Sequence, residues 1–483
     1  MLPFVFHPTN VFLCFMKLPV RNLLLLIVVT SVFLSCKKES FTTSSNDVLK
    51  TDVDTLHFDT VFTTTGSASQ VFKIINENSK GIRVSSVRLA GGSASPFKMN
   101  VDGIAGTGIS NVEIAANDSA YVFITVSIDP NASNLPFIVK DSIEISYNGN
   151  TKWLQLDAYG QNANFLRDKT ITTNEIWNND LPYVILGRLT VEPNATLTIN
   201  EGCKIYMHGD APFIINGSLQ VNGDKYDSTR VIFAGDRLDE PYKNFPASFP
   251  GLFFTETSKN NIINYGIIKN AYQGIVAVGP STGTQLTLNE TIIDNAYDAG
   301  IFAINSSIAA RNVLISNCGK NILLVKGGTY DFTHCTIASF SNKYIQHKEP
   351  VLIISNYLKQ NNTIATADLN AGFRNCLFWA ESGGLVKNEI VVDKQGSGNF
   401  SVSFDNILWP VSENPANATS ITGANIKENP QFDSVNIAER FYSFRLKETS
   451  PAINKGNDFG VTVDLDGKPR PVGLPDLGAY ERR

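Results

Sequence analysis

Residues 187–193, Gly-Arg-Leu-Thr-Val-Glu-Pro, return at residues 217–223 as Gly-Ser-Leu-Gln-Val-Asn-Gly, and each copy is a short alternating strand that ends in a turn. Periods of 22–25 residues with short strands follow and indicate the coils of a parallel β-helix, whose equivalent strands pair one coil apart at ~4.8 Å. A leucine-rich repeat has a similar period, but its LxxLxLxxN signature is missing. The repeats begin 25, 22, 22, 41 and 31 residues apart and place apolar or small residues at positions i, i+3 and i+5: Ile263/Gly266/Ile268, Leu288/Thr291/Ile293, Ala310/Val313/Ile315, Phe332/Cys335/Ile337, Phe373/Cys376/Phe378 and Phe404/Ile407/Trp409.

The repeat predicts which side chains point inward. One inward stack is expected to contain Ile268, Ile293, Ile315, Ile337 and Phe378, with a second apolar contact at Ile275, Ile301, Ile322 and Ile345. Asparagine recurs at i+2 and at i+7, and it tolerates left-handed backbone torsions while its amide can bond the residue one coil away. We therefore interpret these asparagines as structural ladders rather than ligand sites: Asn312, Asn375 and Asn406 at i+2, and Asn270, Asn295 and Asn317 at i+7.

Residues 53–163 have a different pattern, in which short apolar-polar alternations are separated by turn residues. Seven or eight short strands at this spacing indicate an immunoglobulin-like β-sandwich. The preceding residues 37–52 are rich in Lys, Ser and Thr and are predicted to be a flexible tether. The expected strands are Leu56–Phe62, Val71–Asn76, Ile82–Leu89, Phe97–Val101, Val112–Ala115, Tyr121–Ile128, Ser142–Tyr147 and Trp153–Tyr159.

Two parts of the chain resemble known modules. Phe72-Lys73-Ile74-Ile75-Asn76, Leu89-Ala90-Gly91-Gly92 and Leu156-Asp157-Ala158-Tyr159-Gly160 resemble the immunoglobulin-like modules called choice-of-anchor D. The C-terminal motifs resemble the closing segment of secreted β-helix proteins called choice-of-anchor Q, although that family usually has Asp at the position of Asn454. This resemblance covers about residues 166–481 and implies a right-handed parallel β-helix, here assigned to residues 166–483, whose last coil is capped by the segment. The motifs are Asn429-Pro430-Gln431-Phe432, Ser450-Pro451-Ala452-Ile453-Asn454-Lys455-Gly456, Asp464-Leu465-Asp466-Gly467-Lys468-Pro469-Arg470 and Asp476-Leu477-Gly478-Ala479-Tyr480-Glu481.

The N-terminus resembles a bacterial lipoprotein signal over residues 1–36. Its apolar run, Leu23–Leu34, is about half of the ~20 residues that a membrane-spanning helix needs. Ser35 precedes Cys36, which is the predicted lipid-attachment site. Met16 begins a better signal and is an alternative start. The protein is therefore expected to be held by lipid at the outer membrane, exposed at the cell surface, and to contact the membrane through this anchor.

Composition narrows the function. The formal net charge is −5 and the basic residues are scattered, so the sequence has no nucleic-acid footprint. Apart from Cys14 and Cys36, four cysteines remain without CxxC spacing, which argues against a zinc site or a disulfide framework. Cys335 and Cys376 share a repeat position and are interpreted as buried packing residues, with a disulfide as the alternative. We predict no metal and no cofactor.

The search for an active site is mostly negative. β-helices are frequent among polysaccharide lyases and glycosidases, but their motifs are absent, and rung acids such as Asp294, Asp298 and Asp331 do not stack at one repeat position. His208, His334 and His347 are interpreted as isolated turn or packing residues. Asp464-Leu465-Asp466-Gly467 resembles the start of a calcium loop, but Lys468-Pro469-Arg470 replaces the further acids, so a turn is favoured.

Two insertions, 236–250 and 339–371, carry aromatic residues that are expected to form loops on the outside of the β-helix. These aromatics either cover the flank of the β-helix or stack on sugar rings. The ligand-binding candidates are Tyr242, Phe245, Tyr344 and Tyr357. The sequence thus predicts an all-β, lipid-anchored envelope protein that acts as a non-catalytic binding or structural module for a polysaccharide or a surface protein. A polysaccharide lyase or glycosidase with a divergent active site is the alternative.

Overall fold

The computed structural model describes residues 40–63, 66–131, 136–279, 283–361, 363–381, 383–470 and 473–483. Over these residues the chain is all-β, apart from two short 3-10 turns, η1 (Gly92–Ala94) and η2 (Tyr242–Asn244). It divides into two compact units. The first contains the described residues up to Thr55, Val71–Ile124 and Asp141–Gln155, and the second contains Leu56–Gln70, Thr125–Lys140 and Leu156–Arg483. The predicted lipid site, Cys36, lies outside the described residues.

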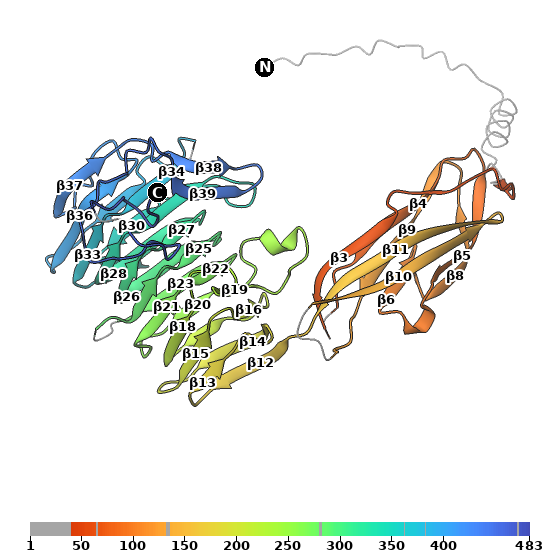
Figure 1. Cartoon of the computed structure of the whole chain (residues 1–483), viewed down its shortest axis with the longest axis horizontal. Helices are drawn as coiled ribbons and strands as arrows, with labels where there is room; N and C mark the ends of the chain where they lie inside the picture. The colour runs from red at the N-terminus through yellow and green to blue at the C-terminus, as the bar shows by residue number, and fades with distance from the viewer. Residues whose placement is uncertain are drawn as a thin grey trace, which may run out of the picture. The chain divides into compact units, whose positions relative to one another are not determined.

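The N-terminal strands form the two sheets of the sandwich (Figure 1). One sheet has the order β1-β5-β10-β11-β3 with β8 beside β5, and the other has the order β2-β4-β9-β6-β7. All eight predicted strands are present. The strands are β1 (Phe41–Thr42), β2 (Lys50–Thr51), β3 (Thr55–Phe62), β4 (Gln70–Asn76), β5 (Gly81–Leu89), β6 (Phe97–Val101), β7 (Ile104–Ala105), β8 (Gly108–Ile114), β9 (Asp118–Val126), β10 (Phe137–Tyr147) and β11 (Asn150–Gln161).

The predicted tether is wrong for residues 41–51. β1 pairs in parallel with β5, and β2 pairs antiparallel with β4. Leu49 is buried, and its backbone N–H donates to the Tyr147 hydroxyl at 3.0 Å. Two-residue edge strands carry too few apolar side chains to produce a visible alternation, so the sequence pattern does not reveal them.

The remaining chain forms a parallel β-helix in which each strand pairs with the equivalent strand of the next coil. Figure 1 shows the coils stacked in chain order. The strands are β12 (Asn164–Ile171), β13 (Glu175–Trp177), β14 (Tyr183–Val191), β15 (Thr196–Asn200), β16 (Lys204–Met207), β17 (Phe213–Ile215), β18 (Ser218–Asn222), β19 (Val231–Gly235), β20 (Leu252–Phe254), β21 (Asn261–Asn264), β22 (Gly266–Lys269), β23 (Gln273–Val278), β24 (Leu286–Asn289), β25 (Ile292–Asp294), β26 (Ala299–Arg311), β27 (Leu314–Ser316), β28 (Lys320–Thr333), β29 (Thr336–Phe340), β30 (Leu352–Ser355), β33 (Leu369–Arg374), β34 (Leu377–Glu381), β35 (Ile390–Asp393), β36 (Phe400–Leu408) and β37 (Ser420–Ile426).

Two hairpins lie outside this ladder: β31 (Tyr357–Gln360) with β32 (Thr363–Thr366), and β38 (Phe432–Asn436) with β39 (Phe441–Leu446). The β-helix begins at β12, two residues before the predicted boundary at residue 166.

The predicted inward stack is confirmed. Ile268, Ile293, Ile315, Ile337 and Phe378 are fully buried and stand in direct register on successive coils. The second contact is correct for the first three positions, Ile275, Ile301 and Ile322, but the fourth is Leu352 and not Ile345. The insertion shifts the next strand to β30, so a count of residues from the repeat start misplaces the contact.

The C-terminal segment does not sit over the last coil as a cap. Instead it lies along the side of the β-helix, where Ala452, Leu465, Leu477, Ala479 and Tyr480 pack with Leu314, Ala338, Leu377 and Leu408 in one apolar cluster. The backbone N–H of Ala479 donates to Thr336 Oγ1 at 2.9 Å, and Arg230 Nη2 donates to the Leu465 carbonyl. The segment therefore ties several coils together.

Candidate functional site

The outward face of the β-helix carries a continuous row of polar side chains, one on each coil. Side chains alternate between the two faces of a strand, and parallel register stacks equivalent positions one above another. This row, the polar column, occupies the position directly after the first apolar residue of each repeat. It consists of Asn200, Asn222, Asn264, Asn289, Arg311, Thr333, Arg374 and Asp405.

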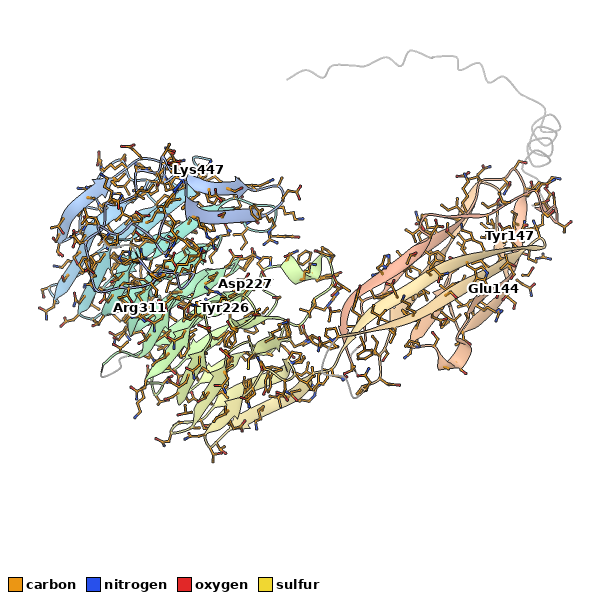
Figure 2. The ribbon with its side chains drawn as sticks, viewed as in Figure 1. Glu144, Tyr147, Tyr226, Asp227, Arg311 and Lys447 are labelled. Atoms are coloured by element: carbon orange, nitrogen blue, oxygen red, sulfur yellow. The ribbon has the colours of Figure 1, made fainter. Side chains whose placement is uncertain are left out.

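Side-chain amides of neighbouring coils form two hydrogen-bonded pairs on this face. Asn200 Nδ2 donates to Asn178 Oδ1 at 2.8 Å, and Asn289 Nδ2 donates to Asn264 Oδ1 at 2.8 Å. Each of these bonds satisfies one donor and one acceptor of the two side-chain amides that form it. The charged members of the column follow on the higher coils, starting at Arg311, which lies among the stacked coils at the end of β26 (Figure 2).

A groove of about 440 Å³ opens on this face, within the size range of ligand sites. Its floor is formed by β24, β26, β28 and β33, and one wall is formed by Phe459, Gly460 and Val461 of the C-terminal segment. We call it the polar groove. Its polar and aromatic lining side chains include Asn289, Arg311, Asp331, Thr333, Arg374 and Phe459.

An ion pair between Asp331 on β28 and Arg374 on β33 lines the polar groove. Arg374 Nη2 donates to both carboxylate oxygens of Asp331. The two side chains remain 37% and 49% exposed, so the pair faces the groove rather than the core. The guanidinium carbon of Arg374 lies 5.4 Å from the centroid of the Phe459 ring. The Asp331–Arg374 ion pair and the Phe459 ring are thus adjacent in the groove.

Asn312 and Asn375 each directly follow a member of the polar column and have a left-handed backbone, where the chain turns a corner. These two asparagines hold the wall of the groove. Asn375 Nδ2 donates to the Asn457 carbonyl at 2.7 Å, and the Asn457 N–H donates to Asn375 Oδ1 at 3.0 Å. Asn312 Nδ2 donates to the Val463 carbonyl at 2.9 Å. These bonds fix the backbone on both sides of Phe459. Asn312 and Asn375, two of the asparagines predicted to be structural, therefore have structural partners, and they also position the groove wall.

The structure gathers three of the four predicted aromatic candidates into one cluster. The ring centroids of Tyr242 and Phe245 are 5.3 Å apart, and those of Phe245 and Tyr344 are 5.1 Å apart. Arg237 lies over Tyr242 at 4.0 Å, and Arg440 lies over Tyr344 at 4.8 Å. The two insertions therefore pack on each other, as expected for loops that cover the flank. Sugar binding by this cluster stays a prediction.

Tyr357 stands apart from this cluster, on the β31–β32 hairpin. Its hydroxyl donates to Asp393 Oδ2 at 2.5 Å. This bond is the main cause of a raised pKa for the Tyr357 hydroxyl. The residue thus has a structural partner, and no second candidate aromatic shares its surroundings among the aromatic contacts of the described residues.

The prediction that three histidines are isolated is wrong. His208 Nδ1 lies 2.7 Å from Asp236 Oδ2, and His347 Nε2 lies 2.9 Å from Glu389 Oε2. Asn375 Nδ2 donates to His334 Nε2 at 2.9 Å. Each partner is more than twenty residues away in sequence and becomes adjacent only when the coils stack, so sequence spacing hides the pairs.

The acids of the coils do not stack on one another. The register places Ser316 beside Asp294 and Gly372 beside Asp331 on the next coil. Burial raises the pKa of the Asp294 carboxyl, while hydrogen bonds from Ser316 and Asn317 oppose the shift. Within the described residues, no group of three or more His, Cys, Asp or Glu side chains could hold a metal ion.

Two further interpretations concern structural residues. Cys203, Cys318, Cys335 and Cys376 are free thiols and buried, which agrees with packing roles. Asp464 Oδ1 accepts the backbone N–H groups of Asp466 and Lys468 at 3.0 and 2.9 Å, so this motif forms a turn. No helix in the described part of the chain is both long and apolar enough to cross a membrane.

Sequence reasoning missed the polar groove. The repeat identifies the outward position of Arg311, Thr333 and Arg374, because each directly precedes a residue of the left-handed corner. Nothing in the repeat predicts that Phe459 returns to the same face. That contact depends on the path of the C-terminal segment along the coils.

Comparisons with known proteins add little to this geometry. No family model matches the chain. No curated protein matches it either. Among solved structures, the chain is similar to a family 123 glycoside hydrolase from Clostridium perfringens, at 16% identity and a TM-score of 0.18, over 26% of this chain and 26% of that chain. The chain thus spans about a quarter of that enzyme's length.

Two other solved structures are similar at comparable levels. The PapD-like domain 7 of human CEP192 is 12% identical with a TM-score of 0.18, over 26% of this chain and 93% of that chain. The catalytic unit of an α-1,3-glucanase of family GH87 from Streptomyces thermodiastaticus is 10% identical with a TM-score of 0.22, over 74% and 88%. The fold assignment here rests on the strand pairing of the chain itself.

Proposed function

We propose that this protein is a lipid-anchored envelope protein that binds a polysaccharide in the polar groove without cleaving it. The observation that carries the proposal is the Asp331–Arg374 pair beside the Phe459 ring in an open groove. A paired carboxylate and guanidinium offer acceptors and donors to sugar hydroxyls. An aromatic ring offers an apolar surface to the C–H groups of a sugar ring.

The direction of the groove supports an extended ligand. Equivalent positions on successive coils are ~4.8 Å apart, so the polar column provides one polar side chain at each step along the coils. A linear polysaccharide also repeats its hydroxyl groups along one direction. The groove floor spans the coils of β24, β26, β28 and β33, which is enough for several sugar residues.

The acid content of the groove favours binding over hydrolysis. Glycosidases use two carboxyl groups on either side of the scissile bond. Among the described residues that line the polar groove, Asp331 supplies the one carboxylate, and it is already paired with Arg374. Asp405 lies two coils from Asp331, which corresponds to about 10 Å along the coils. Asp405 does not line the polar groove, so it supplies no second carboxyl group there.

A glycan array with purified residues 37–483 tests the proposal, with parallel assays for reducing ends and unsaturated products. Phe459→Ala should weaken binding of the best glycan by about tenfold, the effect expected for an aromatic binding contact. Phe441→Ala, which changes a 60% exposed Phe on β39, is the control and should bind as the parent does. Equal binding by both variants argues against the groove, and steady product release favours the lyase or glycosidase alternative.

A further inference from the structure

We infer that the polar groove recognises a polysaccharide with a carboxylate-bearing sugar at Arg311 and a neutral sugar at the Asp331–Arg374 pair. The inference rests on the proposed function and names its ligand class. It follows from a difference between the two groove arginines. They occupy the same polar column, but only Arg374 has its charge neutralised by a bonded carboxylate, that of Asp331.

Arg374 is already neutralised. Both carboxylate oxygens of Asp331 accept from its Nη2 atom, and Phe459 covers the guanidinium. A ligand carboxylate that approached Arg374 would also meet the charge of Asp331, which is half exposed in the same groove. Like charges at this distance repel. The pair is therefore suited to hydroxyl groups and unsuited to an anion.

Arg311 is not neutralised in this way. Its side chain is 51% exposed, and its nearest acid, Glu290, lies 3.7 Å from Nε, beyond hydrogen-bond distance. Glu290 Oε1 instead accepts from Asn312 Nδ2 at 2.9 Å, and the Glu290 side chain is only 4% exposed. The Arg311 guanidinium donates no hydrogen bond to any other residue of the described part of the chain.

An arginine held over a groove with free donors is a site for a carboxylate. The planar guanidinium presents parallel N–H groups that match the two oxygens of a carboxylate. Burial raises the pKa of the Glu290 carboxyl, while the hydrogen bond from Asn312 and the charge of Arg311 oppose this shift. Arg311 and Glu290 therefore interact by charge at 3.7 Å without a hydrogen bond, and the N–H donors of Arg311 remain available to a ligand in the groove.

The spacing of the two arginines sets the ligand pattern. Arg311 pairs in register with Thr333, and Thr333 pairs with Arg374, so two coils separate the arginines. Two coils correspond to about 10 Å, close to the advance of two sugars in an extended chain. A uronate at Arg311 therefore places a sugar that must be neutral at the Asp331–Arg374 pair. Polymers with an isolated uronate fit this rule, and polymers with a uronate at every sugar do not.

Titration with gellan fragments, which carry one uronate in four sugars, tests the inference against the same fragments after carboxyl reduction. We expect the uronate form to bind residues 37–483 at least about tenfold more tightly, the effect of a charge-assisted hydrogen bond. Arg311→Gln should remove this preference. Arg188→Gln, at an exposed arginine on β14 outside the groove, is the matched control and should keep it.

Polygalacturonate, with a uronate at every sugar, tests the role of Asp331. It should bind the parent protein more weakly than gellan fragments, and Asp331→Asn should improve its binding because Arg374 then loses its internal counterion. Equal binding of acidic and reduced gellan, or an unchanged preference in Arg311→Gln, would overturn the inference while leaving saccharide binding intact. Binding of no glycan at all would defeat the proposed function, and this inference with it.

Discussion

A single residue position organises the corner after each outward strand. On successive coils the residue that follows the polar column has a left-handed backbone, with φ between 45° and 54°. Asn fills this position often, as predicted, but its partner on the next coil is not always Asn. Asn312 donates to Glu290 and Asn375 donates to His334. At the other repeat position, i+7, Asn295 does donate to Asn270. The corner residues are Tyr265, Glu290, Asn312, His334, Asn375 and Asn406.

His334 makes this corner sensitive to acid. The side chain is 1% exposed, and burial together with Arg470 lowers the pKa of the His334 imidazole to about 3, while backbone groups of Asp476 and Gly478 oppose the shift. An unfolded histidine has a pKa of about 6.5, so the folded state binds fewer protons below that pH. Stability is therefore present above pH ~6.5 and is lost as pH falls towards 3, at ~1.4 kcal/mol per pH unit.

We predict that His334→Asn flattens this part of the pH dependence, because Asn suits a positive φ and does not titrate. Between pH 6.5 and 4.5 the parent should lose about 2–3 kcal/mol more stability than the variant. Urea unfolding at the two pH values measures the difference. His57→Asn, at an exposed histidine, is the control. Parallel pH profiles for the parent and His334→Asn would show that His334 is not the source.

At the scale of the elements, the stacked core strands set stability. Ile315 on β27 is fully buried between Ile293 and Ile337, whereas Ile364 on β32 is 45% exposed. Ile315→Ala should cost about 2–5 kcal/mol because it leaves a cavity between coils. Ile364→Ala should change stability by less than ~0.5 kcal/mol. Chemical unfolding of both variants checks this, and similar losses would contradict the register.

The same elements show which features the sequence can predict. A repeat records local periodicity, so it gives the register of Ile268 to Phe378 and the left-handed asparagines. It cannot give contacts that depend on the path of a long connection. The capping position of the C-terminal segment and the contact assigned to Ile345 were wrong for this reason, whereas the tether was wrong because its two-residue strands are too short to show an alternation. For the candidate site, the repeat predicts that Arg311 points outward, but it does not predict that Phe459 lies on the same face.

A second element-scale prediction concerns the loop that bears Phe459. Asn375 holds this loop through two bonds to the backbone of Asn457. Asn375→Gly keeps the positive φ of 50° accessible and removes both bonds. We expect a weaker affinity for the bound glycan, by about tenfold, because the aromatic wall must be ordered on binding. Calorimetric titration measures this, and an unchanged affinity would show that the clamp does not position Phe459.

At the scale of the whole molecule, distant segments of the chain build each surface feature. The polar groove combines strands of residues 286–374 with residues 459–461, and the aromatic cluster combines both insertions with Arg440 of the C-terminal region. Such assembly is possible because the coils stack regularly, while the long connections between and after them form loops that lie on this regular surface. The candidate site accordingly lies where a long connection, residues 459–461, contacts the stacked strands.

The last prediction concerns attachment of the whole protein to the membrane. Cys36, outside the described residues, ends an apolar run too short to span a bilayer and follows Ser35. Lipoproteins carry two or three acyl chains, and stable anchoring needs more than one. Cys36→Ala should therefore move the protein from the membrane fraction to the soluble fraction. Cys14→Ala is the matched control and should remain in the membrane, whether Met1 or Met16 starts the chain. A Cys36→Ala protein that still sediments with membranes would exclude lipid at Cys36 as the anchor.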